Sequence, residues 1–548
     1  MPVANVEIVE TIRELYDRGL YLQAYERSKQ LGSFRERAET SERIILGRLA
    51  QNLGGVKLGR VLHLLAVRED PEHPEAAYYG AYAIAERRGL LSSWEYMERL
   101  GDLAYAPQQI RADWIGLRAH LAARLRDFDT SYKLIDAAHE LAPDHAWLMV
   151  EHASIMQAAD RYADALEWAE HALDLRPWFR PGVQCLAHSL VLVGRDQEAL
   201  ELLTKASNHL ESSAIVAQLA DLHCELGNFD EHLAAWERFA ELTPLRDERG
   251  DKFLAGRMYD AAYRCGDYEL ADEWATKADE KTQKLSKSAA NSSGGKRMIL
   301  PVAFVRQHHM TCAPAILTSL AQFWETEVDH LDLAEKICYD GTPHHSQREW
   351  AEQNGWAVRE FTINWDNSRA LIDRGVPFTL TTVDPGNAHL QAVIGYDSRR
   401  RTLIIRDPYC REQIEYLADE ALARYASTGP RGMAIVPKEK SELLDGLEFA
   451  DATLYDCNHR LQCALIEHNR DTAENAFNSM KKVNTDHALT LRAALSIAEY
   501  DADTTERLEA IESLLSHFPE DANLILSKFF CLRELSRRKE RLDLLRTA

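Results

Sequence analysis

The first half of the chain repeats itself at a step of about 34 residues. Pro143 and Pro177 lie one such step apart, each after a helical segment. Small residues keep the same step at Ser131, Ala165 and Ala199. A fixed period of this length is typical of an array in which every unit is one helical hairpin that packs on the next. Residues 1–283 therefore predict a helical repeat array.

One unit shows the pattern in full, from Ala146 to Pro177. Two helical segments meet at the small residue Ala165, and a proline ends the second segment, which resembles a tetratricopeptide repeat. The resemblance implies an α-solenoid whose concave face binds a peptide or a protein partner. A helical bundle without repeats is the alternative.

The composition changes after this array. Residues 284–297 are polar and rich in Lys, Ser, Ala and Gly, which predicts a flexible linker. Residues 298–437 combine a few helical segments with short β-branched runs and predict an α+β domain. Helical periodicity returns over residues 438–548 as a second set of repeats. The predicted fold class is multidomain, with an α-solenoid flanking an α+β domain.

The chain stops at Ala548, early in what looks like the second helix of a repeat. A solenoid generally needs a polar helix to cover its last apolar face. We therefore expect either that this chain is cut from a longer protein or that a homo-oligomer covers this end.

Charge and hydropathy exclude several classes of function. The net charge of −23 is spread along the chain, whereas binding to nucleic acid or to an anionic membrane needs a basic face. No apolar run approaches the ~18–20 residues of a membrane-spanning helix, and the N-terminus lacks the features of a secretion signal. Nine cysteines without paired spacing indicate reduced thiols, so we expect a cytoplasmic protein.

Three residues of the α+β segment stand in an order that suits thiol catalysis. Cys312 precedes Pro314 and an apolar helical run, so its thiol would lie at the positive end of a helix, which favours the thiolate. His389 opens a strand and would hold that thiolate as an ion pair. Asp407 closes the next strand and would orient the imidazole. Each residue type alone is usually structural, but the combination indicates a catalytic site.

The spacing of His389 and Asp407 predicts how they meet. The two residues are symmetric about Ser398, so a tight turn there between antiparallel strands would make them directly opposed cross-strand partners. A bulge would shift this register by one residue and separate the two side chains.

The segment before the cysteine offers an oxyanion donor and, alternatively, metal ligands. Gln307 is the candidate donor, together with the backbone N–H of Cys312. A zinc site would instead use His308, His309 and Cys312. Its further ligands would come from His344, His345, Cys338 or Cys410. The spacing matches no common closed zinc site, so we expect neither a metal nor another cofactor.

The segment around these residues resembles a known family. Residues 298–437 are similar to the bacteriocin-processing peptidases of the papain-like superfamily, which cut leader peptides after a double glycine. The residues that carry the resemblance are Gln307, Thr311 to Ala315, Ala388 to Asp397, and Arg406 to Tyr409. The resemblance implies that the cysteine is the nucleophile, His389 the base, Asp407 the orienting residue and Gln307 the oxyanion donor. Thr311 and Ala313 flank the cysteine where the family commonly has Asp and Gly.

These features together predict a cytoplasmic papain-like cysteine peptidase inserted in a repeat solenoid that recruits its peptide or protein substrate. Two alternatives stay open. One is acyl transfer or deamidation through the same residues, and the other is a non-catalytic scaffold with a degenerate peptidase domain.

Overall fold

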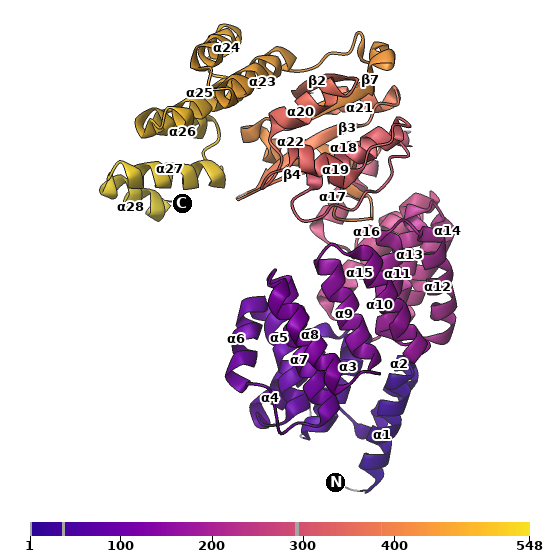
Figure 1. The fold of residues 1–548 in the computed structure, drawn as a ribbon. Helices are drawn as coiled ribbons and strands as arrows, with labels where there is room; N and C mark the ends of the chain where they lie inside the picture. The colour runs from indigo at the N-terminus through magenta and orange to yellow at the C-terminus, as the bar shows by residue number, and fades with distance from the viewer. Residues whose placement is uncertain (1–2, 35–38, 291–294, 385, 548) are drawn as a thin grey trace. The chain divides into compact units, whose positions relative to one another are not determined.

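The computed structural model describes residues 3–34, 39–290, 295–384 and 386–547. The chain divides into two compact units, Met1–Ser286 and Lys287–Ala548. Figure 1 shows helices throughout the first unit, and a sheet with further helices in the second.

The first unit consists of helices joined by short turns. Its helical segments are α1 (Val3–Asp17), α2 (Tyr21–Ser28), η1 (Lys29–Leu31), α3 (Thr40–Asn52), α4 (Val56–Glu69), α5 (Pro74–Arg88), α6 (Leu90–Leu100), α7 (Gln108–Arg124), α8 (Phe128–Leu141), α9 (Ala146–Ala158), α10 (Tyr162–Leu175), α11 (Arg180–Leu192), α12 (Asp196–His209), α13 (Ser213–Glu225), α14 (Phe229–Leu242), α15 (Glu248–Cys265), α16 (Tyr268–Ala275) and α17 (Glu280–Ala290), which continues past Ser286. Helices α8, α10, α12 and α14 begin at residues 128, 162, 196 and 229, which confirms the predicted repeat.

Small or hydrogen-bonded residues stand where the second helix of a repeat crosses the first. Ser131, Ala165 and Ala199 are fully buried at these crossings. A side-chain hydrogen bond of 2.7–2.8 Å to the carbonyl twelve residues earlier recurs at Ser93, Ser131 and His232. The helices can therefore approach closely without leaving a buried polar group unsatisfied.

The first helices of this unit also bond to later ones. The Glu211 N–H donates to the Gly19 carbonyl at 2.9 Å, and the Glu211 carboxylate accepts the Leu22 N–H at 2.8 Å. The Leu245 N–H donates to the Leu53 carbonyl at 3.0 Å. The repeat array is therefore closed on itself.

The second unit contains an antiparallel sheet. Its strands are β1 (Arg297–Ile299), β2 (Trp356–Thr362), β3 (Phe378–Asp384), β4 (Asn387–Asp397), β5 (Thr402–Arg406), β6 (Ile414–Leu417) and β7 (Arg431–Pro437). They pair in the order β2-β7-β3-β4-β5-β6, and β1 adds to β4 beyond the end of β3. The helical segments of this domain are α18 (Cys312–Phe323), α19 (His330–Ile337), α20 (His344–Gln353), α21 (Trp365–Asp373), α22 (Ala418–Arg424), η3 (Ala426–Thr428) and η4 (Lys438–Leu444). Helix α18 packs against β4, so the start of the helix lies beside the central strands.

Three helical hairpins follow the sheet. Their helices are α23 (Ala452–Ile466), α24 (Arg470–Val483), α25 (Ala488–Tyr500), α26 (Thr504–His517), α27 (Ala522–Glu534) and α28 (Arg538–Thr547). Helices α24, α26 and α28 begin at residues 470, 504 and 538, so the step of the first unit returns. The structure thus confirms the predicted fold class, with helical repeats flanking an α+β domain.

The stretch predicted as a linker, residues 284–297, is partly helical. Its first residues continue α17 to Ala290, because Lys, Leu and Ala are good helix formers. Residues 291–294 lie outside the described residues, and Arg297 already pairs in β1. No helix in the described parts of the chain is both long and apolar enough to span a bilayer.

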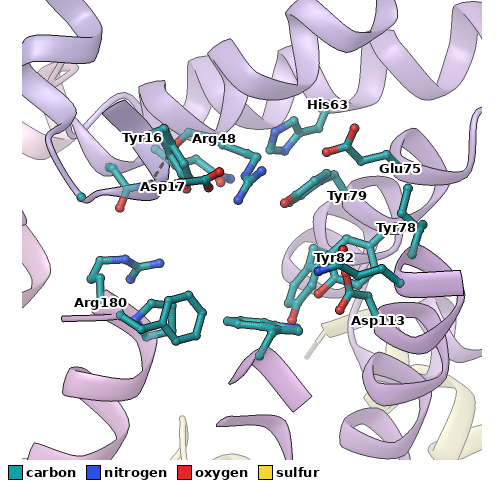
Figure 2. Close-up of a pocket in the computed structure, with 18 of the residues that line it drawn as sticks. Tyr16, Asp17, Arg48, His63, Glu75, Tyr78, Tyr79, Tyr82, Asp113 and Arg180 are labelled. Atoms are coloured by element: carbon teal, nitrogen blue, oxygen red, sulfur yellow. Dashed lines mark hydrogen bonds between the residues drawn. The ribbon is translucent and has the colours of Figure 1, made fainter. Parts of the chain in front are cut away.

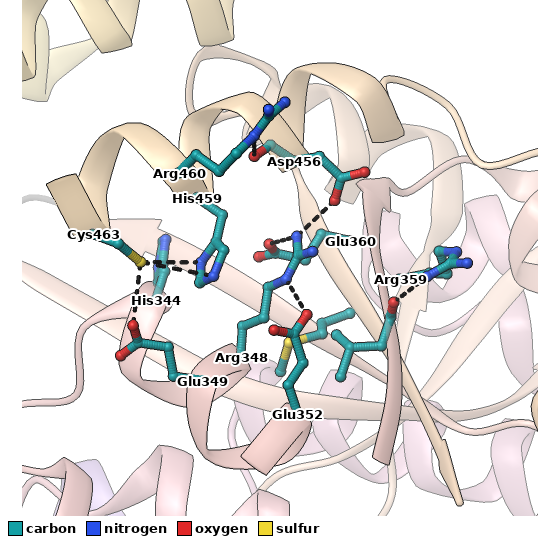
Figure 3. Close-up of polar contacts among 12 residues, drawn as sticks. His344, Arg348, Glu349, Glu352, Arg359, Glu360, Asp456, His459, Arg460 and Cys463 are labelled. Carbon is teal, nitrogen blue, oxygen red and sulfur yellow. Dashed lines mark hydrogen bonds and ion pairs between the residues drawn. The ribbon is translucent and has the colours of Figure 1, made fainter. Parts of the chain in front are cut away.

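A buried charge network joins α23 to the sheet (Figure 3). The Glu360 carboxylate on β2 pairs with Arg431 on β7 at 2.6 Å and with Arg348 on α20 at 3.0 Å. Arg348 also pairs with Asp456 on α23 at 2.8 Å. Burial would raise the pKa of Glu360, but the two guanidinium charges hold it below its usual range. This carboxylate therefore stays charged and fixes both arginines.

Replacing Glu360 by Gln should destabilise the second unit, because two arginines would keep their charges and lose the carboxylate between them. We expect the free energy of unfolding, measured by urea denaturation, to fall by about 3 kcal/mol or more. Glu352→Gln is the matched control, since this more exposed carboxylate pairs with the same Arg348 at 2.8 Å. This control substitution should lower the free energy of unfolding by less than about 1 kcal/mol. Equal losses in the two variants would contradict the role of Glu360.

Candidate active site

Cys312 is the first residue of α18 and follows a turn held by several contacts. The Thr311 N–H donates to the His308 carbonyl at 3.3 Å, and the Thr311 hydroxyl oxygen accepts the His308 N–H at 2.9 Å. His330 on α19 contacts the same hydroxyl at 2.8 Å. Pro314 lies in the first turn of α18, as expected. The thiol therefore lies at the end of the helix where backbone N–H groups are unpaired.

His389 and Asp407 lie together beside this cysteine. His389 is on β4, and its Nε2 atom is 2.9 Å from Oδ2 of Asp407, the residue that follows β5. The His389 side chain also interacts with the Cys312 thiol, and this interaction shifts the pKa of both groups. Because Nε2 faces Asp407, Nδ1 is the nitrogen left to face the thiol. The structure thus brings these three predicted residues together.

The strand register differs from the predicted one. The turn between β4 and β5 spans residues 398–401, which is longer than the tight turn expected from the symmetry about Ser398. Continuing the β4–β5 ladder by one residue places Asp407 opposite Gln391. His389 is therefore a diagonal neighbour of Asp407, and the prediction of direct opposition is wrong. The imidazole is long enough to span the diagonal.

A bulge in β4 places the two side chains on one face of the sheet. The β4–β5 ladder shifts by one residue at Ile394. Without this shift Asp407 would come opposite Ala392, and its side chain would point to the face away from His389. We expected a bulge to separate the two residues. Because the turn is also longer than predicted, the bulge instead restores their common face.

The electrostatics of this group favour an ion pair. Burial would raise the pKa of the Cys312 thiol, but hydrogen bonds from His389 and from the backbone of Leu390 lower it overall. Burial would lower the pKa of His389, but its hydrogen bonds to Asp407 and to the cysteine raise it to about 9. Burial likewise opposes the charge of Asp407, yet its bond with His389 keeps the pKa of this carboxyl below the usual range. At neutral pH these shifts favour thiolate and imidazolium.

Gln391 belongs to this group and is missing from the sequence prediction. Its side-chain amide donates to Oδ2 of Asp407 at 2.6 Å and to the Tyr416 hydroxyl at 3.0 Å. The Tyr409 N–H donates to the other carboxylate oxygen at 2.7 Å. These contacts hold the carboxylate in place for His389. The strand period offered a signal, since residues two apart share a face.

Gln307 is held near the group by its main chain. Its N–H donates to the Pro408 carbonyl at 2.9 Å. The preceding Arg306 lies over the Tyr409 ring, 4.1 Å from the ring centroid, and bonds the Tyr409 carbonyl. The segment before Cys312 is thus tied to the segment after β5. A role for the Gln307 amide in binding an oxyanion stays a prediction.

One group of side chains in the described parts of the chain has the closeness of metal ligands, and it lies in the first unit. Ligand atoms of Cys224, His232 and Asp260 lie within 4.8 Å of one another. Burial raises the pKa of Cys224 to about 12, Arg264 pairs with Asp260 at 2.7 Å, and His232 makes the bond at the repeat crossing. A protonated thiol and a carboxylate already paired with a cation fit a packing network. The described residues around Cys312 form no such group.

The α+β domain matches a protein family. Residues 299–433, about a quarter of the chain, match the model of the Peptidase_C39 like family. This segment is therefore similar to a family of cysteine peptidases. Among curated proteins no relative matches the chain.

Several solved structures of repeat proteins align with part of the chain. PilW, a type IV pilus biogenesis factor, is 13% identical with a TM-score of 0.31, and the match covers 39% of this chain and 97% of PilW. A tetratricopeptide repeat protein from Parabacteroides merdae is 13% identical with a TM-score of 0.31, and 46% of this chain and 97% of that protein are covered. A thermophilic repeat protein from Thermus thermophilus is 19% identical with a TM-score of 0.26, covering 41% of this chain and all of that one.

Asp407→Asn should lower the pKa of His389, because it removes the negative charge that raises this pKa to about 9. The imidazolium is present below its pKa, so the pH at which it is lost should fall by about 1 pH unit or more. An NMR titration of the His389 ring measures this. Asp384→Asn is the control, since this half-exposed carboxylate on the neighbouring β3 pairs with Arg424. An unchanged titration in Asp407→Asn would show that the aspartate does not govern His389.

Proposed function

We propose that the protein is a cysteine peptidase in which Cys312 is the nucleophile, His389 the general base and Asp407 the orienting residue. The observation that supports this best is the His389–Asp407 pair, 2.9 Å apart, which interacts with a thiol at the start of a helix. The family match over residues 299–433 supports the same chemistry.

The reaction follows from the positions of these groups. The Cys312 thiolate attacks the scissile carbonyl carbon, the peptide C–N bond breaks, and the His389 imidazolium gives its proton to the leaving amine. Water then adds to the thioester with His389 as the base, which releases the acid and restores the thiol. Asp407 keeps the imidazole oriented in both steps. The Cys312 N–H and the Gln307 amide are the proposed donors to the oxyanion.

The helical repeats would recruit the peptide or protein substrate. Helices of the second unit are joined to the sheet through Arg348 and Glu360, so a partner bound to them would be held near Cys312 at high effective concentration. All nine cysteines are free thiols, which supports a reducing compartment such as the cytoplasm.

Thiol labelling tests the activated pair. With iodoacetamide over pH 4–9, followed by intact mass, Cys312 should react fastest and already below pH 7, because its pKa is lowered. Cys312→Ala should remove the fast label and His389→Ala should slow it. The control Cys338→Ala, which removes another partly exposed thiol, should retain it. If all accessible thiols react alike, the peptidase proposal fails.

Peptide profiling then tests the reaction. Cleavage of a peptide library should fall at least about a thousandfold in Cys312→Ala and in His389→Ala. Cys410→Ala should cleave as the parent does, since the pKa of this thiol is raised by burial. Capture of the acyl group by an added amine, with no hydrolysis in water, would replace the peptidase proposal by acyl transfer.

A further inference from the structure

The closed first unit contains a cavity of about 480 Å³ (Figure 2). Its lining residues come from the first half of the unit, among them residues of α1, α3, α5, α7, α9 and α11. The bonds of Gly19 to Glu211 and of Leu53 to Leu245 join the first repeats to the later ones around it. A cavity of this size suits a small molecule rather than an extended protein segment.

A guanidinium in this cavity lacks an acceptor. The Arg48 side chain lies over the rings of Tyr16 and Tyr79, at 4.5 and 5.4 Å from their centroids. Within the described residues it makes no hydrogen bond and no ion pair. Burial opposes its charge, but nearby groups, Tyr79 and Tyr16 before Glu75 and Asp17, keep its pKa above the usual value. This partly buried cation therefore has N–H donors open to an anionic acceptor in the cavity.

A second guanidinium faces the same space. Arg180 on α11 bonds the side chains of Gln184 and Tyr21, while its Nε–H is buried without an acceptor. Figure 2 shows Arg48 and Arg180 pointing from different walls toward the cavity. Both side chains therefore offer N–H donors to the cavity.

Carboxylates line the cavity as well. Figure 2 shows Glu75 and Asp113 on the side away from Arg180. Asp113 pairs with His145 at 2.7 Å, whereas Glu75 comes only within 4.0 Å of Arg13. Aromatic residues also line the cavity: Tyr16, Tyr21, Tyr78, Tyr79, Tyr82, Trp147 and Phe179. A phosphate dianion would be repelled by the carboxylates, whereas a ligand with both charges meets a partner on each side.

We propose that this cavity binds a small dipolar ligand, a free α-amino acid or a dipeptide. Its carboxylate pairs with Arg48, and its ammonium group lies beside Glu75 and Asp113. The aromatic residues of the lining contact the side chain of the ligand, and the faces of their rings attract the ammonium group. This binding function belongs to the repeat unit and does not depend on the chemistry at Cys312.

Calorimetry and thermal unfolding of the full chain test the proposal. The chain carries Cys312→Ala, so that no hydrolysis consumes the probe. The probes are the twenty free amino acids and, in a separate series, a set of dipeptides with free termini. Comparing the two series shows which of the two kinds of ligand the cavity binds. We expect members of one of the two series to bind with a Kd below about 1 mM and to raise the Tm of the protein. Amidating the C-terminus of a bound probe should weaken binding at least about tenfold, because it removes the charge that pairs with Arg48.

Arg48→Met separates a ligand-binding role from a packing role. Arg48→Met should weaken binding at least about tenfold. The Tm without ligand should change little, because methionine keeps the apolar stem and Arg48 makes no hydrogen bond or ion pair within the described residues. Arg48→Lys, which keeps the charge, should retain part of the affinity. Arg124→Met, at the exposed end of α7, is the control and should bind as the parent does.

Three results would overturn the proposal. The first is that no amino acid and no dipeptide binds with a Kd below about 1 mM. The second is that the amide, or inorganic phosphate, binds as tightly as the free acid. The third is that Arg48→Met lowers the Tm and leaves the affinity unchanged, which would assign Arg48 to packing alone.

Discussion

Both the sheet and the candidate active site depend on strand β4. It pairs with β1, β3 and β5, so its register decides which face each of its side chains takes. Its bulge lies beside Gly395, where an added Cβ would stand 2.2 Å from the Met298 carbonyl of β1. Glycine is therefore required where β1 crosses, and the strand departs there from regular pairing. This local irregularity turns His389 and Gln391 toward Asp407.

Two buried carboxylates of the second unit each have a lowered pKa because they pair with a cation, but their roles differ. Glu360 is held between Arg348 and Arg431, which stay protonated, so its low pKa reports a structural tie between the sheet and α23. Asp407 is held by His389, whose pKa is raised to about 9 and whose side chain lies beside a thiol. A shifted pKa therefore indicates chemistry only where a nucleophile and a titrating base lie together.

The first unit contains a charged side chain in a different setting. Its repeats stack through small or hydrogen-bonded residues at their crossings, and tyrosines and arginines of its helices line the cavity. Arg431 is neutralised within the fold, whereas Arg48 meets only aromatic rings at close range. The N–H donors of Arg48 are therefore open to an acceptor on a ligand, as the proposed binding site requires.

The helical hairpins, the α+β domain and the order of Cys312, His389 and Asp407 can be predicted from the amino-acid sequence. These follow from local signals, namely the 34-residue period, the proline near the helix start and the β-branched runs. The register of β4, the contact of Gln391 and the closure of the first unit were decided by the tertiary structure. They depend on pairings between distant segments, such as the bond from Leu22 to Glu211 across 189 residues. Such pairings produce no periodic pattern in the sequence, because they depend on how distant elements pack against one another in the folded chain.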